Sequence, residues 1–532
     1  MNSNTPSKIL LVSAVAVASV VGILTTAQEG GDDGFHPIFD GKSLEGWAGE
    51  DALWKIEDKA ITGVTTDETP IKGNTFLVWE AGEVDDFELK LEYKIENGNS
   101  GIQIRSFRRG GPDKPFSISG YQADFEAGTQ WSGTIYGEGY HGVHAARGQK
   151  RKRIEGEKFE DLGKVGESDE LQKYIKTGDW NSYHITAKGN HIITRINGHV
   201  MAEIIDEAPD ARRSGLLALQ LHAGPAMKVQ FRDIKLKRLA LEDRKKVVFI
   251  AGKPSHPART HEHNAGCMLL TKQINEHHAD KMVATTYTNG WPSDPSAFQN
   301  ADSVVMFADG GQRHPAFFHL KTLEALRNRG VGVGAIHYAV EMIPGETNDT
   351  LASCIGGAFE IDYSINPHWV AKFGDYPKHP TANGLKPFEI NDEWYFNMRF
   401  VEGMKGVTPV LSAVPPIETI SRPDGHHSGN PEVRKMVEAG DKQHVGWVYQ
   451  READGGRGFG TSGAHYHDNW ADDDFRTFVL NATAWISKVE IPETGIVTPT
   501  PTKAELDANL DPKPARKPKK APKKPAEKKK AA

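Results

Sequence analysis

Apolar and polar residues alternate along much of the first half of the chain. From Phe87 to Ile95 every second side chain is apolar, which is typical of a strand that buries one face. The pair Gly189-Asn190 separates two further alternating segments and predicts a tight hairpin. The other segments with strand character are Leu53–Ile56, Thr75–Trp79, Ile102–Ser106, Tyr121–Phe125, Ser182–Lys188, His191–Ile196, Gly215–Leu221 and Met227–Leu236. Many short strands at hairpin spacing predict a β-sandwich between about Phe35 and Leu239.

The alternation also places polar side chains on shared faces of these strands. Gln103 and Arg105 are expected on the face opposite to Ile102 and Ile104. Two later strands repeat the pattern with Gln122, Asp124 and Glu126, and with Gln220 and His222. Such residues can be ordinary solvent-facing positions of an antiparallel sheet. An amide, a guanidinium, carboxylates and an imidazole on one sheet face could equally line a binding site.

A different pattern begins after residues 239–244. Residues 247–251 are all apolar, as in a parallel strand that is buried on both faces. Further strands and helices then alternate, at Met282–Tyr287, Ser303–Phe307 and Val331–Ile336 for strands and at Asn264–Glu276 and Ala316–Arg329 for helices. This alternation predicts a doubly wound α/β fold from about Arg244 to Val489, with ligands outside the carboxyl ends of the strands.

Histidines gather where these strands end. His261 and Glu262 follow the first strand, His337 follows a later one, and His465 and His467 lie near the end of the domain. A single histidine is more often a packed or surface residue than a ligand. Convergence at several strand ends predicts a polar substrate site or a divalent metal site, holding zinc or calcium.

Charge and cysteine content exclude several classes of protein. The 532 residues include 64 Lys and Arg against 71 Asp and Glu, and the net charge of −7 argues against general nucleic-acid binding. Two cysteines, Cys267 and Cys354, cannot build a disulfide framework or a cysteine-rich zinc site. We expect no nucleotide cofactor. The charged insertion from Tyr140 to Leu171 is expected to be a solvated loop, with its basic run Arg147–Arg153 at the surface.

Both ends of the chain differ from the domains between them. Lys8, an apolar run from Ile9 to Leu24 and small residues up to Ala27 predict a secretory signal peptide over residues 1–27. An uncleaved anchor is the alternative, because the run is nearly long enough to span a membrane. Export would place the mature chain in the periplasm or outside the cell, with no integral membrane domain. Residues 499–532, rich in Pro, Lys and Ala, are expected to form a disordered tail.

Several motifs of the first region resemble one family. They are FHPIFDGKSLEGW, NSGIQIR, GYQADF, WSGTIYG and GLLALQLHAG, and they run in the order of the 3-keto-disaccharide hydrolase family. The resemblance implies a concanavalin-like jelly roll and cleavage of glycosides that are already oxidised at C3 of the sugar. A ketone at C3 acidifies the C2 hydrogen, so that a base can remove it and the enolate can expel the aglycone.

The residue types of the polar face suit this chemistry. Asp124, Glu126 or His222 could be the base. The enolate could be held by Arg105, or by a divalent metal bound through Asp124 and His222. The remaining polar residues, which could bind the sugar, are Gln103, Gln122, Tyr136 and Gln220.

The second region is similar to the trehalose-utilisation (ThuA-like) family, a relative of class I glutamine amidotransferases. The supporting motifs are FIAGKPSHPARTHEHNAG, GVGVGAIHYAVE, HPTANGLKPFEINDEWYFN and GGRGFGTSGAHYHDNWADDDFRTFVLNATAW. Amidotransferases place a nucleophilic cysteine where this chain has His337, so glutaminase chemistry is not expected. The resemblance implies handling of keto-sugars derived from trehalose-like disaccharides, with a bound zinc.

Together these observations predict an exported carbohydrate-active enzyme that cleaves glycosides or oligosaccharides. The alternative is a non-catalytic protein, in which the sandwich only binds glycan and the α/β domain is a scaffold. The two hypotheses differ in whether Arg105, Asp124, Gln220 and His222 converge in one pocket or spread over an open groove. No sequence pattern indicates an oligomeric state.

Overall fold

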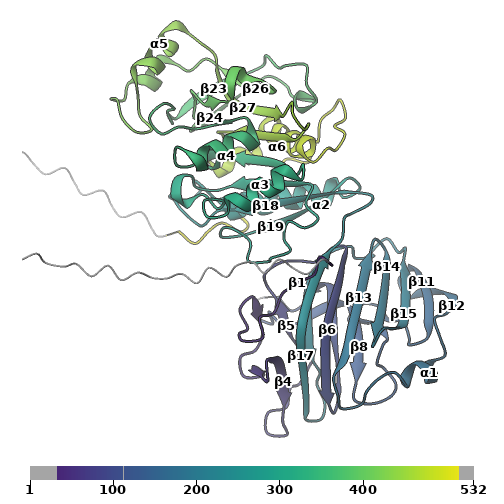
Figure 1. Cartoon of the computed structure of the whole chain (residues 1–532). Coiled ribbons are helices and arrows are strands. Elements are labelled where there is room, and N and C mark those ends of the chain that lie inside the picture. Colours follow the sequence, from purple (N-terminus) through teal and green to yellow (C-terminus); the bar gives the residue numbers. More distant parts are fainter. Residues whose placement is uncertain (1–32, 112, 514–532) are drawn as a thin grey trace, which may run out of the picture.

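Two domains follow one another along the chain (Figure 1). The computed structural model describes residues 33–111 and 113–513. The predicted signal peptide and residues 514–532 of the predicted tail lie outside the described residues. None of the helices in the described ranges is both long enough and apolar enough to cross a membrane.

The first domain is a sandwich of two mostly antiparallel sheets, as the alternation predicts. The order of the larger sheet is β12-β11-β15-β14-β13-β6-β17-β4-β3, with β1 paired to β17. Its strands are β1 (His36–Pro37), β3 (Trp54–Glu57), β4 (Ala60–Thr65), β6 (Phe87–Glu96), β11 (Gln149–Glu155), β12 (Lys158–Lys164), β13 (Asn181–Lys188), β14 (His191–Ile196), β15 (His199–Asp206) and β17 (Met227–Arg238).

The smaller sheet has the order β10-β9-β8-β7-β16-β5-β2. Its strands are β2 (Trp47–Ala48), β5 (Thr75–Trp79), β7 (Asn99–Arg108), β8 (Ile118–Glu126), β9 (Ile135–Glu138), β10 (Gly142–Ala145) and β16 (Leu216–Leu221). Apolar side chains of the two sheets meet in one core, where Leu89 and Tyr93 of β6 join Ile102 of β7 and Phe125 of β8. Burial of each such side chain stabilises the fold by about 1.5–3 kcal/mol.

The insertion at residues 140–171 is not a solvated loop. Its strands β11 and β12 extend the larger sheet, β11 pairs in parallel with β15, and the short helix α1 (Ser168–Gln172) follows. Arg153, expected at the surface, is fully buried, with its Nε atom 2.8 Å from Oδ2 of Asp206. Arg147, at the start of the run, is also buried and donates to the carbonyl oxygens of Ser132 and Thr129. The expectation is wrong because both ends of the basic run face inward and find acceptors there.

The second domain is an α/β fold around a seven-stranded sheet in the order β19-β18-β20-β21-β28-β27-β26. The first five strands in this order are parallel, and β27 runs antiparallel to both of its neighbours, β28 and β26. The strands are β18 (Lys245–Ala251), β19 (Met282–Tyr287), β20 (Ser303–Phe307), β21 (Gly332–Ile336), β26 (Val407–Ala413), β27 (Gln443–Gln450) and β28 (Arg457–Thr461).

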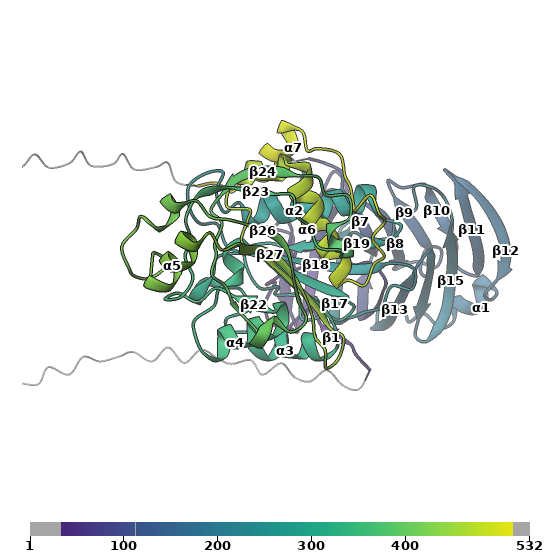
Figure 2. The same ribbon diagram turned by 90° about the horizontal axis from the view of Figure 1, so that it is seen from above.

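Helices cover both faces of this sheet (Figures 1 and 2). Apolar residues of α2 (His263–His277) and α6 (Asp473–Ile486) pack on one face, and those of α3 (Leu320–Asn328) and α4 (Glu346–Ile355) on the other. The remaining elements are the pairs β22 (Gly357–Ala358) with β25 (Arg399–Phe400) and β23 (Trp369–Phe373) with β24 (Phe388–Asp392), helix α5 (Pro431–Ala439), and the 3-10 turns η1 (Gly311–Arg313), η2 (His337–Val340), η3 (Pro380–Ala382), η4 (Glu402–Met404), η5 (Ile417–Ile420) and η6 (His467–Ala471).

Residues 499–513 do not form part of an extended tail. They include helix α7 (Lys503–Asp507), whose first turn is closed by a capping box between Thr502 and Glu505. The side chain of Leu506 is buried in the core of the α/β domain. The expectation of disorder from Pro499 onward fails here because the local capping signal and one buried leucine outweigh the polar composition.

Buried charges join the two domains. Asp85 follows β5 of the sandwich, and its Oδ2 lies 2.7 Å from Nζ of Lys246 in β18. Arg238, at the end of β17, donates from Nη2 to Oδ2 of Asp294 at 2.8 Å. All four side chains are at most 3% exposed. Removing one partner of such a pair costs about 3–5 kcal/mol, so these contacts hold the domains together.

Candidate active site and metal centre

Four neighbouring strands of the smaller sheet bring the predicted polar residues together. Gln103 of β7 lies opposite Gln122 of β8, which lies opposite Tyr136 of β9. The amide of Gln103 donates to Oε1 of Gln122 at 2.6 Å, and Nε2 of Gln122 lies 3.3 Å from both Oδ1 of Asp124 and Oε1 of Gln220. Alternation turns these side chains away from the sandwich core. They form a continuous amide ladder that ends at Asp124.

Asp124 is the most perturbed carboxyl of this ladder. Asp124 is only 4% exposed. Burial removes the water that would stabilise the charged form, and it raises the pKa of Asp124 to about 8 despite hydrogen bonds that favour ionisation. The carboxyl therefore exchanges its proton near neutral pH, which is the range in which a general acid or base works best.

The ladder opens onto a cavity at its other end. Nε2 of Gln220 and Nδ2 of Asn74 each donate to Oε2 of Glu138 at 3.2 Å. Asn74 and Glu138 both line a cavity of about 960 Å³, together with Phe76, Arg109, Lys114 and Phe116. Neither Asn74 nor Glu138 was identified from the sequence. Glu138 could have been identified from strand alternation, because it lies two residues after Tyr136 in β9 and therefore on the same face.

Tyr136 lies beside these carboxyls and is half-buried. Burial, with the negative charges of Glu138 and Asp124, raises the pKa of the Tyr136 hydroxyl above its ordinary value. The hydroxyl therefore keeps its proton at neutral pH and can donate a hydrogen bond to a ligand oxygen.

Arg105 does not join this face. The register of β7 against β8 shifts between Ile104 and Phe107, and Arg105 has a positive φ of 46°. Its guanidinium is buried and donates to Oδ1 of Asp86 at 2.8 Å and to the carbonyl oxygen of Asp85 at 2.7 Å. The prediction that Arg105 shares a face with Gln103 is wrong, because a β-bulge interrupts the two-residue alternation.

Glu126 and His222 make their side-chain hydrogen bonds outside the ladder, although the charge of Glu126 still helps to raise the pKa of Asp124. Oε1 of Glu126 accepts from the backbone N–H groups of Gln130 and Trp131, so this carboxylate closes a loop. His222 follows β16 and its Nδ1 contacts the carbonyl of Ala223 at 2.5 Å. Two groups of residues in the described ranges could hold a metal ion, and both lie in the α/β domain, so neither includes Asp124 or His222. The structure thus gives no support to a metal held by that pair.

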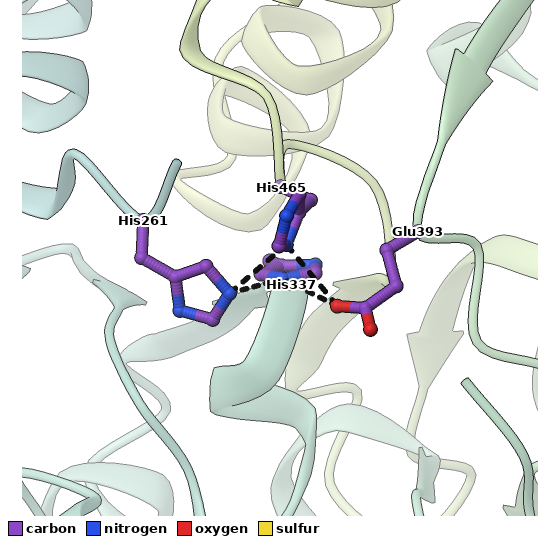
Figure 3. A group of neighbouring side chains, drawn as sticks. All are labelled: His261, His337, Glu393 and His465. Atoms are coloured by element: carbon purple, nitrogen blue, oxygen red, sulfur yellow. Dashed lines mark hydrogen bonds and ion pairs between the residues drawn. The ribbon is translucent and has the colours of Figure 1, made fainter. Parts of the chain in front are cut away.

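The α/β domain brings four potential metal ligands to one point (Figure 3). They are His261, His337, Glu393 and His465, and their ligand atoms all lie within 4.8 Å of one another. The contacts are 3.0 Å between the Nε2 atoms of His337 and His261, and 3.1 Å from Nδ1 of His465 to both His261 Nε2 and Glu393 Oε2. All four side chains are at most 13% exposed.

These residues come from the carboxyl ends of different strands, where an α/β fold binds ligands. His261 lies between β18 and α2, His337 follows β21 directly, and His465 follows β28. Glu393 comes directly after β24, in the small sheet beside the main one. His261 and His337 have positive φ angles of 48° and 58°, a backbone strain that clusters at functional sites.

Hydrogen bonds on the far side of two rings fix their protons. Nδ1 of His337 faces the carbonyl oxygen of Ser462 at 2.8 Å, and Nδ1 of His261 faces Oδ1 of Asp309 at 2.9 Å. Burial and the neighbouring imidazoles hold the pKa of both histidines far below its ordinary value, so both rings are neutral. A neutral ring with its proton on Nδ1 has a lone pair on Nε2. Two lone pairs therefore face each other at 3.0 Å.

This donor set fits a divalent metal. Ligands at about 2.0–2.1 Å in a tetrahedron lie about 3.3 Å apart. The observed separations of 3.0, 3.1 and 3.1 Å, with 3.7 Å between His337 Nε2 and Glu393 Oε2, bracket this value. A cation at the centre would also relieve the repulsion between lone pairs. Imidazole nitrogens with one carboxylate suit zinc better than calcium, which prefers oxygen ligands.

Two of the predicted ligands lie elsewhere. The carboxylate of Glu262 accepts from the N–H of Arg259 at 2.7 Å and pairs with Lys513 at 3.1 Å. His467 faces the carbonyl of Leu506 with its Nε2 at 2.9 Å. His261, His337 and His465 converge as the sequence indicated, whereas Glu393 was missed. No periodic signal marks Glu393, because it belongs to a side sheet that the strand–helix alternation does not reveal.

A cavity of about 560 Å³ adjoins the cluster at Glu393. Its lining includes Asn366, His368, Trp369 and Arg422. Nδ2 of Asn366 donates to Oε1 of Glu393 at 3.2 Å, while Oε2 of Glu393 faces the histidines. The cluster is therefore reachable by a small polar molecule from this side.

Comparison with known families assigns both regions. The profile of the 3-keto-alpha-glucoside-1,2-lyase-like domain matches residues 34–237, and that of the trehalose utilisation (ThuA) family matches residues 247–486. The chain is a 3-keto-glucoside-lyase-like domain followed by a ThuA domain. Both names refer to carbohydrates, so the lyase-like domain and the ThuA domain agree in the general area of their function.

Solved structures of similar proteins include relatives of each domain. A candidate glycosyl hydrolase from Parabacteroides distasonis is 21% identical, covers 38% of this chain and 99% of its own, and has a TM-score of 0.27. Candidate ThuA-like proteins from Bacteroides uniformis and Parabacteroides merdae are 14% and 15% identical, with TM-scores of 0.33 and 0.32. They cover 46% and 48% of this chain, and 91% and 98% of their own. No curated protein matches the chain.

Proposed function

We propose that the lyase-like domain removes the aglycone from 3-keto-glycosides by elimination, with Asp124 as the base. The observation that carries this proposal is a buried carboxyl with a pKa near 8 at the inner end of an amide ladder whose outer end opens onto a cavity. The match to a 1,2-lyase-like family supports the type of reaction. If the side chain at position 124 had only a structural role, an amide like those of the neighbouring glutamines could fill the same place.

The reaction balances without an external oxidant or reductant. The C2–H bond breaks, its proton passes to Asp124, and the electron pair forms an enolate with the C3 ketone. The C1–O bond then breaks, which leaves a C1=C2 double bond conjugated with the ketone, and the aglycone oxygen takes up a proton. The hydroxyl of Tyr136 and the amides of Gln122 and Gln220 supply donors for the sugar oxygens. Water can add to the product afterwards.

The test is incubation of the purified full chain with matched glycosides, with and without a ketone at C3, in deuterated water. We expect cleavage of the oxidised sugars only, because an unactivated C2 hydrogen is far too weakly acidic for a carboxylate. Deuterium should appear at C2 of recovered substrate. Equal rates on both kinds of sugar would contradict elimination, and binding without cleavage of any would favour a glycan-binding module.

We also propose that the ThuA domain is a divalent-metal centre that acts on a related keto-sugar. The convergence of His261, His337, Glu393 and His465 supports this second function. A metal bound there would supply a Lewis acid able to polarise a carbonyl. The chain's own contribution would be four largely buried ligands for the metal and the adjacent cavity, where Asn366 orients Glu393.

Elemental analysis of protein purified without chelators tests the metal centre. We expect close to one zinc per chain. Less than about a tenth of an equivalent of any divalent metal, even after incubation with zinc, would contradict this proposal.

We further propose that the protein is exported. The basic residue, apolar run and small residues before Gln28 support cleavage near that position. Sequencing of the N-terminus of the protein from its native cell is the test. An intact Met1 on a protein in the cytoplasm would contradict export.

A further inference from the structure

The segment that follows the ThuA fold returns across the loops that carry two of the clustered histidines. We call residues 499–513 the C-terminal strap. Its helix α7 lies against α2 and η6, and Leu506 is buried in the domain core (Figure 2). The carbonyl of Leu506 meets Nε2 of His467 at 2.9 Å, two residues after His465. The strap thus contacts the His465 loop directly.

The outer contacts of the strap are exposed ion pairs. Asp507 lies 2.7 Å from Arg259, and Glu505 lies 2.6 Å from Lys272. These side chains are 27–43% exposed, so solvent screens the pairs and each contributes little to stability. They bring the strap to the His261 loop but do not fix its geometry.

The last described residues of the strap make a different kind of contact. Nζ of Lys513 lies 3.1 Å from Oε1 of Glu262, and the two side chains are only 3% and 1% exposed. The other carboxylate oxygen of Glu262 accepts from the N–H of Asp511 at 3.0 Å. Asp511 in turn accepts from Nδ2 of Asn264 at 2.8 Å. A buried charge pair with this many partners is costly to break.

Lys513 also holds the backbone of the His261 loop. Its ammonium group donates to the carbonyl oxygens of Pro257, Thr260 and His261 itself. Arg259 and His261 in this loop have φ angles of 64° and 48°, a conformation that residues other than glycine and asparagine adopt only when their surroundings impose it. Three contacts from one buried lysine supply that constraint.

We propose that the C-terminal strap positions the metal ligand His261, with Lys513 and Glu262 as the positioning pair. The inference rests on the proposed metal centre, and it gives Glu262 a role other than metal ligation. Without the pair, the loop would relax from its strained conformation and Nε2 of His261 would leave the point where the other ligands meet. The strap would then act on the affinity for the metal and on the order of residues 257–263.

The test compares Lys513→Met with Lys503→Ala, a control in the same strap whose lysine is 83% exposed. Methionine keeps the length and packing of Lys513 but removes its charge and donors. Two quantities are measured on the full chain: zinc affinity, by competition with a chromophoric chelator, and amide hydrogen exchange of residues 257–263. For Lys513→Met we expect zinc affinity to fall by about 10-fold or more and exchange to rise by a similar factor, as for other groups that orient metal ligands. Lys503→Ala should match the wild type.

The outcomes separate this inference from the metal centre itself. A wild-type chain that binds no zinc refutes the centre, while hydrogen exchange still shows whether the strap orders the loop. Wild-type zinc affinity in Lys513→Met refutes the positioning role, whatever happens to exchange. Circular dichroism and thermal unfolding verify that each variant folds. If Lys513→Met does not fold, a chain ending at Leu510 keeps α7 and Leu506 and removes the pair, and the same two measurements decide.

Discussion

The two candidate sites are assembled by different means. In the lyase-like domain, Gln103, Gln122 and Asp124 come from neighbouring strands of one sheet, and strand alternation alone puts them on one face. In the ThuA domain, His261, His337 and Glu393 come from loops that start on separate elements, and the fold has to bring them together. The first site shifts the pKa of a single carboxyl by burial, and the second concentrates lone pairs that need a cation.

The comparison teaches that burial favours the neutral form of the side chain in both domains, with opposite effects on the pKa. A buried carboxyl without a cation, such as Asp124, keeps its proton until about pH 8 and becomes a stronger base once the proton leaves. Buried imidazoles that crowd one another, such as His261 and His337, lose their protons and become ligands. The variants below should therefore affect one site and leave the other intact.

The largest effect is expected for Asp124→Asn. An amide cannot remove the C2 proton, so kcat on a 3-keto-glycoside should fall by about 10²–10⁴-fold while zinc content stays unchanged. Steady-state kinetics and elemental analysis of the same sample measure both. Asp179→Asn is the matched control, because Asp179 is exposed, its carboxylate accepts from the N–H of Trp180, and its amide analogue keeps an acceptor oxygen. Equal losses in the two variants would remove Asp124 from the role of base.

The second variant, His337→Ala, addresses the metal. Loss of one of four converging ligands should reduce bound zinc from about one equivalent to less than about a tenth. Cleavage of 3-keto-glycosides by the lyase-like domain should persist. His319→Gln, at the start of α3 and outside the cluster, serves as the control. If His337→Ala also abolishes cleavage, the two sites do not work independently.

The pH dependence sharpens the contrast further. Because the base must be ionised, kcat/KM should rise about tenfold per pH unit well below the pKa of Asp124 near 8 and level off above it, a change of about 50-fold from pH 6 to pH 8. Stability should change in the opposite direction. A pKa raised by folding means that the folded state holds the extra proton, so this stabilisation is complete below pH 4 and is lost as the pH rises through 8. Rate profiles and urea unfolding at several pH values measure the two trends. A flat rate profile would contradict the assignment.

A smaller change is expected for Asp309→Asn. Asp309 does not face the centre but orients His261 through Nδ1, and loss of such an outer partner costs about 10–100-fold in metal affinity. Competition with a chelator measures the affinity. Asp375→Asn, a change at an exposed carboxylate, should have no effect. Unchanged affinity in Asp309→Asn would show that the His261 ring is oriented by other contacts.

The smallest effect on rate is expected for Arg105→Met. Arg105 bonds to Asp86 and to the Asp85 carbonyl rather than to the amide ladder. Breaking this buried pair should lower the free energy of unfolding by about 3–5 kcal/mol, while kcat per folded molecule stays within about twofold. Denaturant unfolding and active-site-normalised kinetics distinguish the two. A large loss of kcat in fully folded protein would indicate that Arg105 acts on the substrate after all.

Sequence alone determined much of this protein. Strand alternation located Gln103, Gln122, Asp124 and Gln220 on one face, because a two-residue period is a local property of an extended backbone. The change to apolar runs placed the second domain and the strand ends that carry His261, His337 and His465. Local rules sufficed for each of these features.

Only the tertiary structure decided the rest. The bulge after Ile104 redirected Arg105. It is a shift in the register between two strands, which the local two-residue period does not encode. Glu393 reached the histidines from a side sheet, and Lys513 reached Glu262 across about 250 residues of chain. Such contacts depend on how separately folded elements pack, and their free energy comes from burial in the finished core. The sequence named the candidate groups, and packing decided which of them meet.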